Sequence, residues 1–373
     1  METVMVSVIA VNHNSSALLK ECFSSIVSTI GDKPFEFLII DSGSRGEDLD
    51  TVRNLKGDNV SIRVNKDNIG YARAVNEGIR NARGNVILIT NPDVLYKPGS
   101  VGSMFDALSQ LPRCGAVAPK TWWNRGMTFL LPFSELVTPY SVLRTEFMKG
   151  SLTMGKMIQK RWIKKALGYW LSEKPISQKM LSGACIMTTR RVLDEIGGFD
   201  DSFPLYFEDT DWSLRVRKAG YRLYMVPKAN IIHYYNQSAK QDMRASQKKF
   251  QESSDLYLGK HFKVQRSLFP FVQQLLKVGQ RNVSAIYEDL GVLTAPPTVT
   301  FKDSAAKLLL LSPVECLIPS AGSFFQGDLF QIPEDLWDML GAGRYYVKAI
   351  ELDRLADCGS WSWVKSAINK ATR

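Results

Sequence analysis

An acid cluster near the middle of the chain contains groups that could accept a proton. Glu208, Asp209 and Asp211 lie in the stretch LYFEDTDW, at the start of a segment with a helical pattern. Residues two apart on a helix point in different directions, so Asp209 and Asp211 cannot both reach one substrate atom. A carboxylate here can act as a general base or interact with the positive end of the helix. The spacing alone leaves both roles open.

Asp93 and His233 are candidates for a divalent-cation site. Asp93 follows an apolar run in the sequence TNPDV, and His233, one of three histidines, follows the apolar segment ANII. Mg2+ takes carboxylate ligands together with substrate phosphates, and Mn2+ also tolerates imidazole. Taken alone, an Asp at the end of a strand is more often a turn residue, and a lone His on an apolar segment is more often a core residue. Together with a diphosphate, they could hold a metal ion.

Alternating strands and helices would position these side chains. Apolar and periodic runs predict strands at 4–11, 35–41, 61–67 and 85–90, and helices at 16–29 and 68–84. This alternation predicts a parallel α/β sheet. Ligands of such sheets bind beyond the carboxyl ends of the strands. Four polar residues fall at those ends: Asn12, Asp41, Asp67 and Asp93.

The segment 121–178 interrupts this pattern and is rich in Trp, Met, Lys and Arg. Between residues 144 and 174 it carries eight Lys or Arg residues against two Glu. Its stretch KMIQKRWIKKALGYWL contains Trp162 and Trp170 and predicts a basic amphipathic helix, which would contact an anionic membrane surface. The alternative is a solvated insertion that is packed by its aromatic residues. The pattern favours neither.

The chain is predicted to have two domains. The α/β pattern returns at about 182 and continues to a polar helix at 241–262, so we assign 1–265 to the first domain, with 121–178 as an insertion. Residues 266–290 are interpreted as a linker. Short strands between Pro and Gly turns then predict a small β-sandwich-like domain at 291–373.

Composition excludes several classes of protein. With 45% hydrophobic residues, the chain can build a core. Its five Cys have no CxxC spacing, which favours a reducing compartment. There is neither a run of about 18 apolar residues nor a basic leader before the first strand. We therefore expect a cytoplasmic protein, with peripheral contact at the inner membrane face as a further expectation.

The net charge of +10 is compatible with phosphorylated ligands, an anionic membrane or nucleic acid. No zinc-finger spacing or RNA-binding aromatic motif is present, so we expect no nucleic-acid partner.

Six motifs occur in the order seen in one enzyme family: VSVIAVNHNS, FLIIDSGS, NIGYARAVNEGI, NPDV, SGACIMTTRRVLDEIGGFDDSFPLYFEDTDWSLRVRKAGYRL and HYYNQS. Over about residues 4–240 the chain resembles the inverting glycosyltransferases of family two, and among them the rhamnosyltransferase branch. The resemblance implies a GT-A fold, a Rossmann-like mixed α/β sheet that binds a nucleotide-diphospho-sugar. A small, mostly-β domain would follow it at the C-terminus.

The resemblance also implies roles for individual residues. Asp209 matches the catalytic base, and Asp93 matches the metal-binding acid of the DXD motif, with Asn91 where the first Asp often stands. His233 matches a further metal ligand, although Tyr and Asn replace the glycines that usually follow it. The implied cofactor is Mg2+ or Mn2+. The implied donor site contains Asn12, Asp41, Asp67, Asn68, Gly70, Asn76 and Asn91, and the implied acceptor site contains Gly183, Glu208 and Asp211.

The implied reaction moves a sugar, from dTDP-rhamnose or a UDP-sugar, to a hydroxyl of a cell-surface glycan or lipid-linked acceptor. Direct displacement with one base inverts the anomeric carbon, and the metal neutralises charge on the departing diphosphate. Such a reaction belongs to cell-envelope polysaccharide biosynthesis. A nucleotidyltransferase is the first alternative, but NHNSS after the first strand is neither Gly-rich nor basic. A non-catalytic carbohydrate-binding or scaffold protein is the second, and the presence of Asp93, Asp209 and His233 argues against it.

Overall fold

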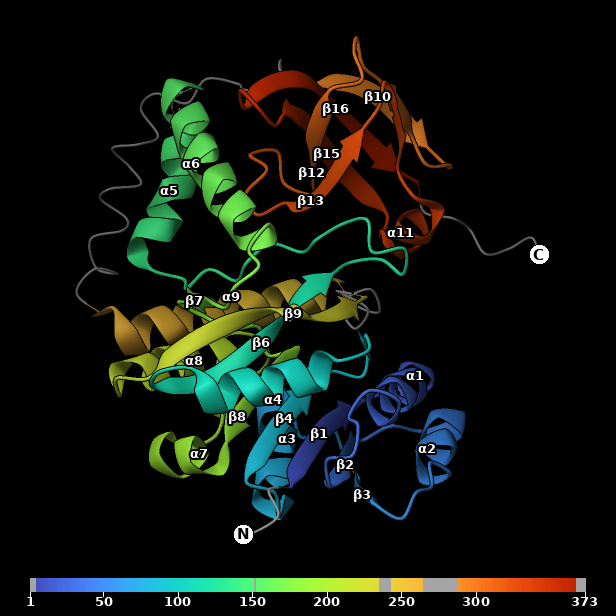
Figure 1. Ribbon diagram of the computed structural model, residues 1–373, viewed down its shortest axis with the longest axis vertical. Helices are drawn as coiled ribbons and strands as arrows, with labels where there is room; N and C mark the ends of the chain where they lie inside the picture. Colours follow the sequence, from blue (N-terminus) through green and yellow to red (C-terminus); the bar gives the residue numbers. More distant parts are fainter. Residues whose placement is uncertain (1–4, 151, 235–242, 264–286, 367–373) are drawn as a thin grey trace. The chain divides into compact units, whose positions relative to one another are not determined.

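The computed structural model describes residues 5–150, 152–234, 243–263 and 287–366 (Figure 1). The chain divides into two compact units. Unit 1 comprises Met1–Thr121, Ser134–Val137 and Ser172–Lys263, and unit 2 comprises Trp122–Phe133, Thr138–Leu171 and Val264–Arg373. Most of the predicted insertion thus groups with the C-terminal part of the chain. The predicted linker, 266–290, lies largely outside the described residues.

Unit 1 is built on a nine-stranded sheet with the order β3-β2-β1-β4-β8-β6-β9-β5, and β7 pairs with β9. The pairs β1–β2, β1–β4 and β2–β3 are parallel, whereas β8 is antiparallel to β4 and β6. This mixed sheet confirms the fold class that the resemblance implied and corrects the wholly parallel sheet that the alternation predicted. The strands are β1 (Val6–Asn12), β2 (Phe35–Ser42), β3 (Val60–Asn65), β4 (Val86–Thr90), β5 (Val94–Tyr96), β6 (Cys114–Trp122), β7 (Ile176–Gln178), β8 (Cys185–Thr189) and β9 (Arg222–His233).

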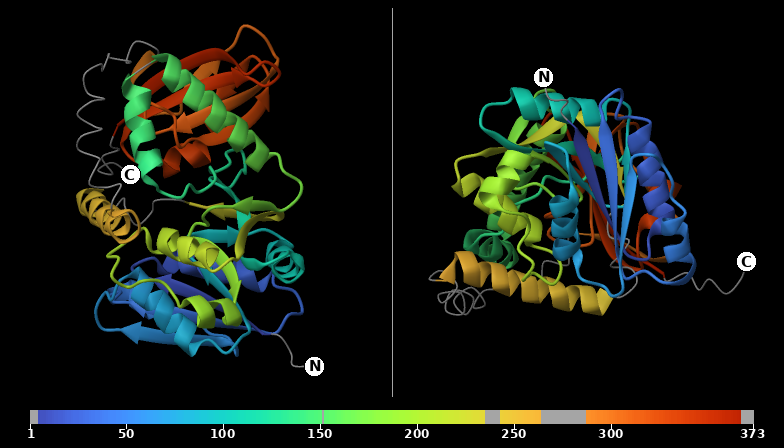
Figure 2. Two further views of the ribbon diagram at one scale, coloured as in Figure 1. Left: turned by 90° about the vertical axis from the view of Figure 1, so that its left-hand side faces the viewer. Right: turned by 90° about the horizontal axis from the view of Figure 1, so that it is seen from below.

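Helices cover both faces of this sheet (Figure 2). The first face is covered by α1 (Ser16–Val27), α2 (Gly46–Arg53) and α4 (Ser100–Gln110). The second is covered by α3 (Tyr71–Asn81), α7 (Arg190–Ile196) and α8 (Glu208–Lys218). Burial on both faces explains the continuous apolar runs of β1 and β2. Helix α2 was not predicted from the sequence, whereas α9 (Met243–His261) agrees with the predicted polar helix.

Unit 2 contains one five-stranded sheet, β10-β16-β15-β12-β13, and a two-stranded ribbon of β11 and β14. The C-terminal part is thus β-rich, as predicted, although a single sheet with helices on it differs from a sandwich of two large sheets. The elements are α5 (Pro139–Gly150), α6 (Leu152–Trp170), β10 (Glu288–Leu293), β11 (Thr298–Thr300), β12 (Ala306–Ser312), β13 (Ala321–Gln326), β14 (Leu329–Gln331), α11 (Glu334–Met339), β15 (Gly343–Glu351) and β16 (Ala356–Lys365).

The two tryptophans of α6 belong to the core of unit 2. Trp162 and Trp170 are 4% and 2% exposed and pack with Leu308 and Leu310 of β12. The indole N–H of Trp170 donates to the carbonyl of Leu131 at 2.9 Å. A Cβ at Gly322 would lie only 2.5 Å from the Trp170 ring, so this strand position requires Gly. The packing alternative is therefore correct for these aromatic residues.

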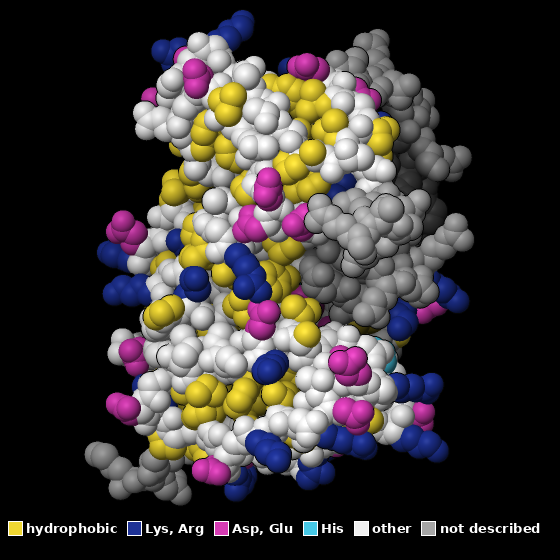
Figure 3. All heavy atoms as spheres, turned by 90° about the vertical axis from the view of Figure 1, so that its right-hand side faces the viewer, with side chains coloured by type: hydrophobic (Ala, Val, Ile, Leu, Met, Phe, Trp, Pro, Cys, Tyr) yellow, Lys and Arg dark blue, Asp and Glu magenta, His cyan; other side chains and the backbone are white. Residues whose placement is uncertain are grey.

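The charged residues of the chain are not gathered into one patch on the face shown in Figure 3. Lys and Arg side chains lie interspersed with Asp and Glu side chains there. Among the described residues, none of the helices is both long enough and apolar enough to cross a membrane.

Candidate active site

The register of two antiparallel strands brings Asp93 and His233 together. Asp93 directly precedes β5, and Val94 of β5 pairs with His233 at the end of β9. The backbone N–H of Tyr234 donates to the Asp93 carbonyl at 3.1 Å, and the His233 Nε2 lies 3.3 Å from Asp93 Oδ1. Two residues 140 positions apart in the sequence thus form one pair, as a shared cation site requires.

The chemistry of this pair fits a divalent cation. Burial alone would raise the pKa of Asp93, but the charge of His233 and its hydrogen bond outweigh burial and lower the pKa below its ordinary value. Asp93 therefore stays ionised at neutral pH. Asn91 adds a buried Oδ1 that has no hydrogen-bond partner among the described residues. These three residues offer too few ligands for a closed metal site, and Mg2+ and Mn2+ commonly take the rest from phosphate and water oxygens.

The acid pair Glu208 and Asp209 follows a strained turn. Tyr206 and Phe207 both have φ of +68°, a left-handed conformation that costs a bulky residue roughly 1–3 kcal/mol. Phe207 is the N-cap of α8, so Glu208 and Asp209 form its first turn. Strain of this kind persists only where the surrounding structure holds it, and it is common at functional sites.

Glu208 is buried as a neutral acid at neutral pH. Burial and then the charge of Asp209 raise the pKa of Glu208 to about 8. Its Oε2 is buried and has no hydrogen-bond partner among the residues that the structure describes. A protonated carboxyl group in this position can donate a hydrogen bond to a ligand.

Asp209 is oriented by the loop before β8. Its Oδ2 accepts from the N–H of Gly183 at 2.8 Å, and its Oδ1 accepts from the N–H of Thr210 at 2.6 Å. Burial raises the pKa of Asp209 despite these hydrogen bonds, which lower it. A Cβ at Gly183 would come within 3.3 Å of the Asp209 Cβ, so Gly permits this close approach. A carboxylate that is fixed in place and has a raised pKa suits a general base.

Tyr71 contacts the loop that holds Asp209, and it was not among the site residues predicted from the sequence. Its hydroxyl donates to the Gly183 carbonyl at 2.9 Å. Burial, and then the charges of Glu208, Asp209 and Asp93, raise its pKa well above the ordinary value. The half-buried phenol of Tyr71 thus lies beside Gly183, whose N–H also holds Asp209. The position of Tyr71 at the start of α3, within the third motif, was the available signal.

The burial of Glu208 predicts a stability that falls as pH rises. Glu208 titrates near 4.5 when unfolded and near 8 when folded. Between these values the folded state binds more protons, so the free energy of unfolding decreases with pH, by at most about 1.4 kcal/mol per pH unit for one group. Denaturant unfolding between about pH 5 and about pH 8, without added metal, measures the slope. Glu208→Gln should flatten it, whereas the exposed Glu252→Gln should not. Equal slopes for Glu208→Gln and the parent would contradict this result.

Asp211 is a buried ion-pair partner. Its side chain is fully buried, and it contacts Arg215, Lys260 and His261, each at 2.7 Å. Burial would raise the pKa of Asp211, but these three partners lower it. Both carboxylate oxygens of Asp211 already have protein partners and can offer little to an acceptor substrate. The contacts therefore favour a structural role over the predicted acceptor-binding role.

Five of the seven predicted donor residues lie at the ends of β1 and β2 and after β3. The Nδ2 of Asn12 donates to Asp41 Oδ2 at 2.8 Å and to Asp48 Oδ2 at 3.0 Å. Asn12 and Asp41 are fully buried, and the Oδ1 of Asn12 has no partner among the described residues. Asp48, in the first turn of the unpredicted helix α2, thus joins the predicted pair.

The loop after β3 lies against the same strand ends. Asn68 Oδ1 accepts from Ser42 Oγ at 3.2 Å and from the N–H of Gly70 at 2.9 Å. Gly70 has φ of +85°, which favours Gly, and it precedes α3. Asp67 is exposed beside them. Gly43 was missed, although a Cβ there would lie 2.5 Å from the Asn68 nitrogen.

Asn76 lies apart from this group. Its Oδ1 accepts from the N–H of Phe199 at 2.9 Å, and its Nδ2 donates to the Phe199 carbonyl at 2.7 Å. Both amide groups are therefore occupied by backbone. These contacts favour a role in fastening the loop before α8 to α3, rather than the predicted contact with the nucleotide or sugar.

The mixed α/β sheet, with polar residues and an acid pair at one edge, has the GT-A glycosyltransferase fold. The sequence model of glycosyl transferase family 2 matches residues 7–197, just over half of the chain, and the chain belongs to this family.

Curated relatives extend the likeness beyond that segment. The chain is 28% identical over 257 residues to the N-acetylglucosaminyl-diphospho-decaprenol L-rhamnosyltransferase of Mycobacterium tuberculosis, with 64% of this chain and 79% of the relative covered. It is 23% identical over 256 residues to the low-salt glycan biosynthesis hexosyltransferase Agl10 of Haloferax volcanii, with 68% and 72% covered.

Two solved structures are similar at a lower level. GalNAc-T7 with UDP, GalNAc and Mn2+ has 16% identity and a TM-score of 0.48, covering 74% of this chain and 54% of its own. The mannosyltransferase PcManGT from Pyrobaculum calidifontis with GDP-Man and Mn2+ has 17% identity and a TM-score of 0.44, covering 73% of each chain. At these TM-scores the likeness supports no assignment of residues or ligands.

Proposed function

We propose that this chain is a metal-dependent, inverting glycosyltransferase that moves a sugar from a nucleotide-sugar donor to an acceptor hydroxyl. The observation that carries the proposal is a backbone link between the segments that bear Asp93 and Asp209: the N–H of Asn91, two residues before Asp93, donates to the Ala184 carbonyl at 2.9 Å, and the N–H of the adjacent Gly183 holds Asp209 at 2.8 Å. One of these acids contacts His233, and another is held by a backbone N–H as a base would be. A cation site and a base thus share one region of the sheet edge.

Asp209 takes the proton of the acceptor hydroxyl as this oxygen attacks the anomeric carbon. The N–H of Gly183 fixes the orientation of the carboxylate, and its raised pKa makes it a stronger proton acceptor. Neutral Glu208 can donate a hydrogen bond to the bound acceptor. One base and direct displacement suffice, so the configuration at the anomeric carbon inverts.

Asp93 and His233 would hold the divalent cation, together with the Asn91 Oδ1, which lacks a hydrogen-bond partner in the described part of the chain. Mn2+ or Mg2+ bound there supplies positive charge against the diphosphate leaving group.

The donor and acceptor are proposed from the relatives. The name of the mycobacterial relative specifies L-rhamnosyl transfer to a diphospho-decaprenol-linked acceptor. We propose dTDP-rhamnose as the first donor to test, a UDP-sugar as the second, and a lipid-linked acceptor or cell-surface glycan as the substrate.

A panel of nucleotide sugars, with and without Mn2+, tests this function. A donor present at about a hundred times its Kd should stabilise the fold by about 2.7 kcal/mol. Product formed from that donor should carry the inverted anomeric configuration by NMR. A donor that binds but is neither transferred nor slowly hydrolysed would favour the non-catalytic carbohydrate-binding alternative. Retention of configuration in the product would exclude the inverting mechanism.

Contact with an anionic membrane, together with a cytoplasmic location, stays a prediction. Because Trp162 and Trp170 are buried, it now depends on the exposed face of α6, where Lys156, Lys160 and Lys164 lie. Co-sedimentation with anionic vesicles should weaken with salt, since exposed charges are screened beyond about 10 Å at about 0.1 M. Equal recovery on neutral and anionic vesicles would contradict it.

A further inference from the structure

The turn before the acid pair has a backbone conformation that its own residues do not favour. Tyr206 and Phe207 are consecutive left-handed residues with bulky side chains, and this conformation is unfavourable for both of them. It nevertheless sets the direction in which α8 begins, and therefore where Glu208 and Asp209 point. Some neighbouring element must maintain the turn.

Helix α9 contacts this turn from outside the sheet (Figure 2). The hydroxyl of Ser253 donates to the Leu205 carbonyl at 2.7 Å. The ring centroid of Phe250 lies 5.8 Å from that of Tyr206 and 5.2 Å from that of Phe207. The Tyr257 ring lies 5.5 Å from the Phe207 ring. Both strained residues are therefore packed against one helix.

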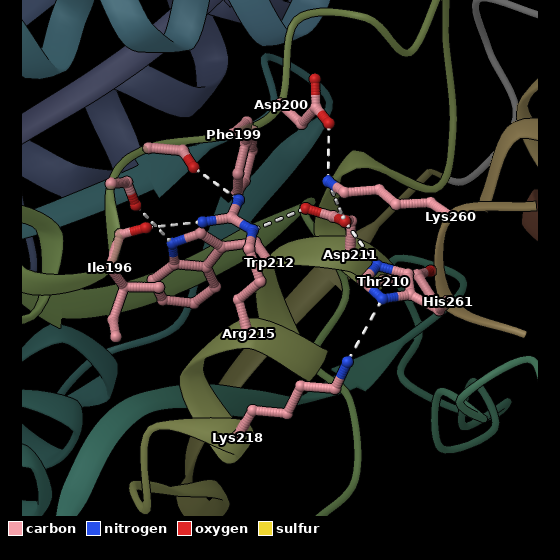
Figure 4. A network of polar contacts seen from close by, with 12 residues as sticks. Ile196, Phe199, Asp200, Thr210, Asp211, Trp212, Arg215, Lys218, Lys260 and His261 are labelled. Atoms are coloured by element: carbon pink, nitrogen blue, oxygen red, sulfur yellow. Dashed lines mark hydrogen bonds and ion pairs between the residues drawn. The ribbon is translucent and has the colours of Figure 1, made fainter.

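The end of α9 contacts α8 a second time, at Asp211, which follows the acid pair in the sequence (Figure 4). Lys260 bridges Asp211 and Asp200, with its Nζ 2.7 Å from each carboxylate. His261 Nε2 lies 2.7 Å from Asp211 Oδ1. Arg215 contacts the remaining oxygen of Asp211 at 2.7 Å. The buried charge of Asp211 thus depends on two residues from α9 for much of its compensation.

These two contacts bracket Glu208 and Asp209 in the sequence. We propose that α9 is the positioning element of the acid pair: Phe250, Ser253 and Tyr257 maintain the strained turn, and Lys260 and His261 anchor the helix to Asp211. These are positioning residues, which act through Asp209 and do not touch the substrate. The inference rests on the proposed function of Asp209 as the base.

We expect α9 to support catalysis by positioning Glu208 and Asp209, and not by raising the stability of the whole fold. Phe250 is 50% exposed, so truncating it removes little buried surface from the fold while it removes ring contacts from both strained residues. The strand ends where the donor residues gather belong to β1, β2 and the loop after β3, which make none of these contacts. Loss of positioning should therefore lower kcat and leave donor binding unchanged.

Phe250→Ala tests the proposal in the full-length protein. We expect kcat to fall about tenfold while KM for the donor stays within about twofold. Phe250→Tyr keeps the ring and should restore kcat. Leu256→Ala is the matched control, because Leu256 lies on the same helix, is 39% exposed and makes none of these ring contacts. A second pair compares Lys260→Met with Lys248→Met, since Lys248 pairs only with Glu252 in the described structure.

The pH slope of stability gives a readout that does not require transfer. If α9 holds the turn that buries Glu208, Phe250→Ala should admit water to the acid pair and flatten the fall in stability with pH, whereas Leu256→Ala should retain it. A parent without transfer activity would refute the proposed function and still leave this comparison informative. Parental kcat and slope in Phe250→Ala, or equal losses in Leu256→Ala, would overturn the positioning role of α9.

Discussion

Asp209→Asn is expected to lower kcat by roughly a hundred- to ten-thousandfold, the usual contribution of a positioned general base. The donor Kd should not change, because the donor residues lie at the ends of other strands. Asn has nearly the shape of Asp, so the lost property is proton acceptance. Steady-state kinetics with a saturating donor, together with calorimetric donor binding, separate these two effects.

The contacts of Asp209 also predict how this substitution affects stability. The carboxylate accepts from the N–H groups of Gly183 and Thr210 with different oxygens. In Asn one of these oxygens becomes an NH2 group that faces an N–H donor, so one hydrogen bond is lost, at a cost of about 1 kcal/mol. Removing a buried negative charge beside Glu208 offsets part of this cost. The variant should therefore fold, and its low kcat should not reflect unfolding.

Asp201→Asn is the matched control. It makes the same chemical change at an exposed acid that pairs with Arg73, so its kcat should stay parental. If Asp209→Asn keeps kcat within about threefold of the parent while Glu208→Gln loses it, the base is Glu208. If neither substitution lowers transfer, the acid pair is structural.

The fold of unit 1 could be predicted largely because each of its long strands has a local sequence pattern, a continuous apolar run. Residues such as Ile39 and Ile40 are buried on opposite faces, which produces the continuous apolar runs. Helix α2 could not be predicted in this way, because its sequence GEDLDTVR buries only Val52. Its first turn, which places Asp48 beside Asn12, therefore carries no apolar helical pattern that could have revealed it.

The architecture of unit 2 depends on pairing between distant segments. Trp162 and Trp170 were read as candidates for membrane contact, and they instead cover Leu308 and Leu310 about 150 residues later. Amphipathic periodicity shows that a helix has an apolar face. It does not show whether that face meets lipid or a sheet whose sequence lies far along the chain.

The same limit applies within the site. The spacing of Asp209 and Asp211 correctly implied that their side chains point in different directions. It could not indicate that Asp211 contacts Lys260 and His261 of α9, about 50 residues later in the sequence. Asn76 was assigned from its motif alone, whereas the Phe199 backbone takes both of its amide groups. Motif position places a residue near a site, and the partners of its polar atoms determine what it can do there.

Asp93→Ala is expected to abolish donor binding that depends on a divalent cation. Asp93 is the only ionised oxygen ligand in the proposed set, since His233 and Asn91 contribute neutral groups to a cation. Without it, the attraction between the site and the cation loses its main Coulomb component. With the parent at about a hundred times its donor Kd in Mn2+, the stabilisation of about 2.7 kcal/mol should disappear in this variant.

Each variant is compared with its own ligand-free form, because Asp93→Ala also removes the contact with His233. The parent in excess chelator should behave like Asp93→Ala in Mn2+, whereas His233→Ala and Asn91→Ala should weaken binding less. Donor binding to Asp93→Ala that is as tight and as Mn2+-dependent as in the parent would show that the cation is held elsewhere. Parental binding that survives chelation would instead show that the transferase needs no cation to hold its donor, and Asp93 and His233 would then be a structural pair.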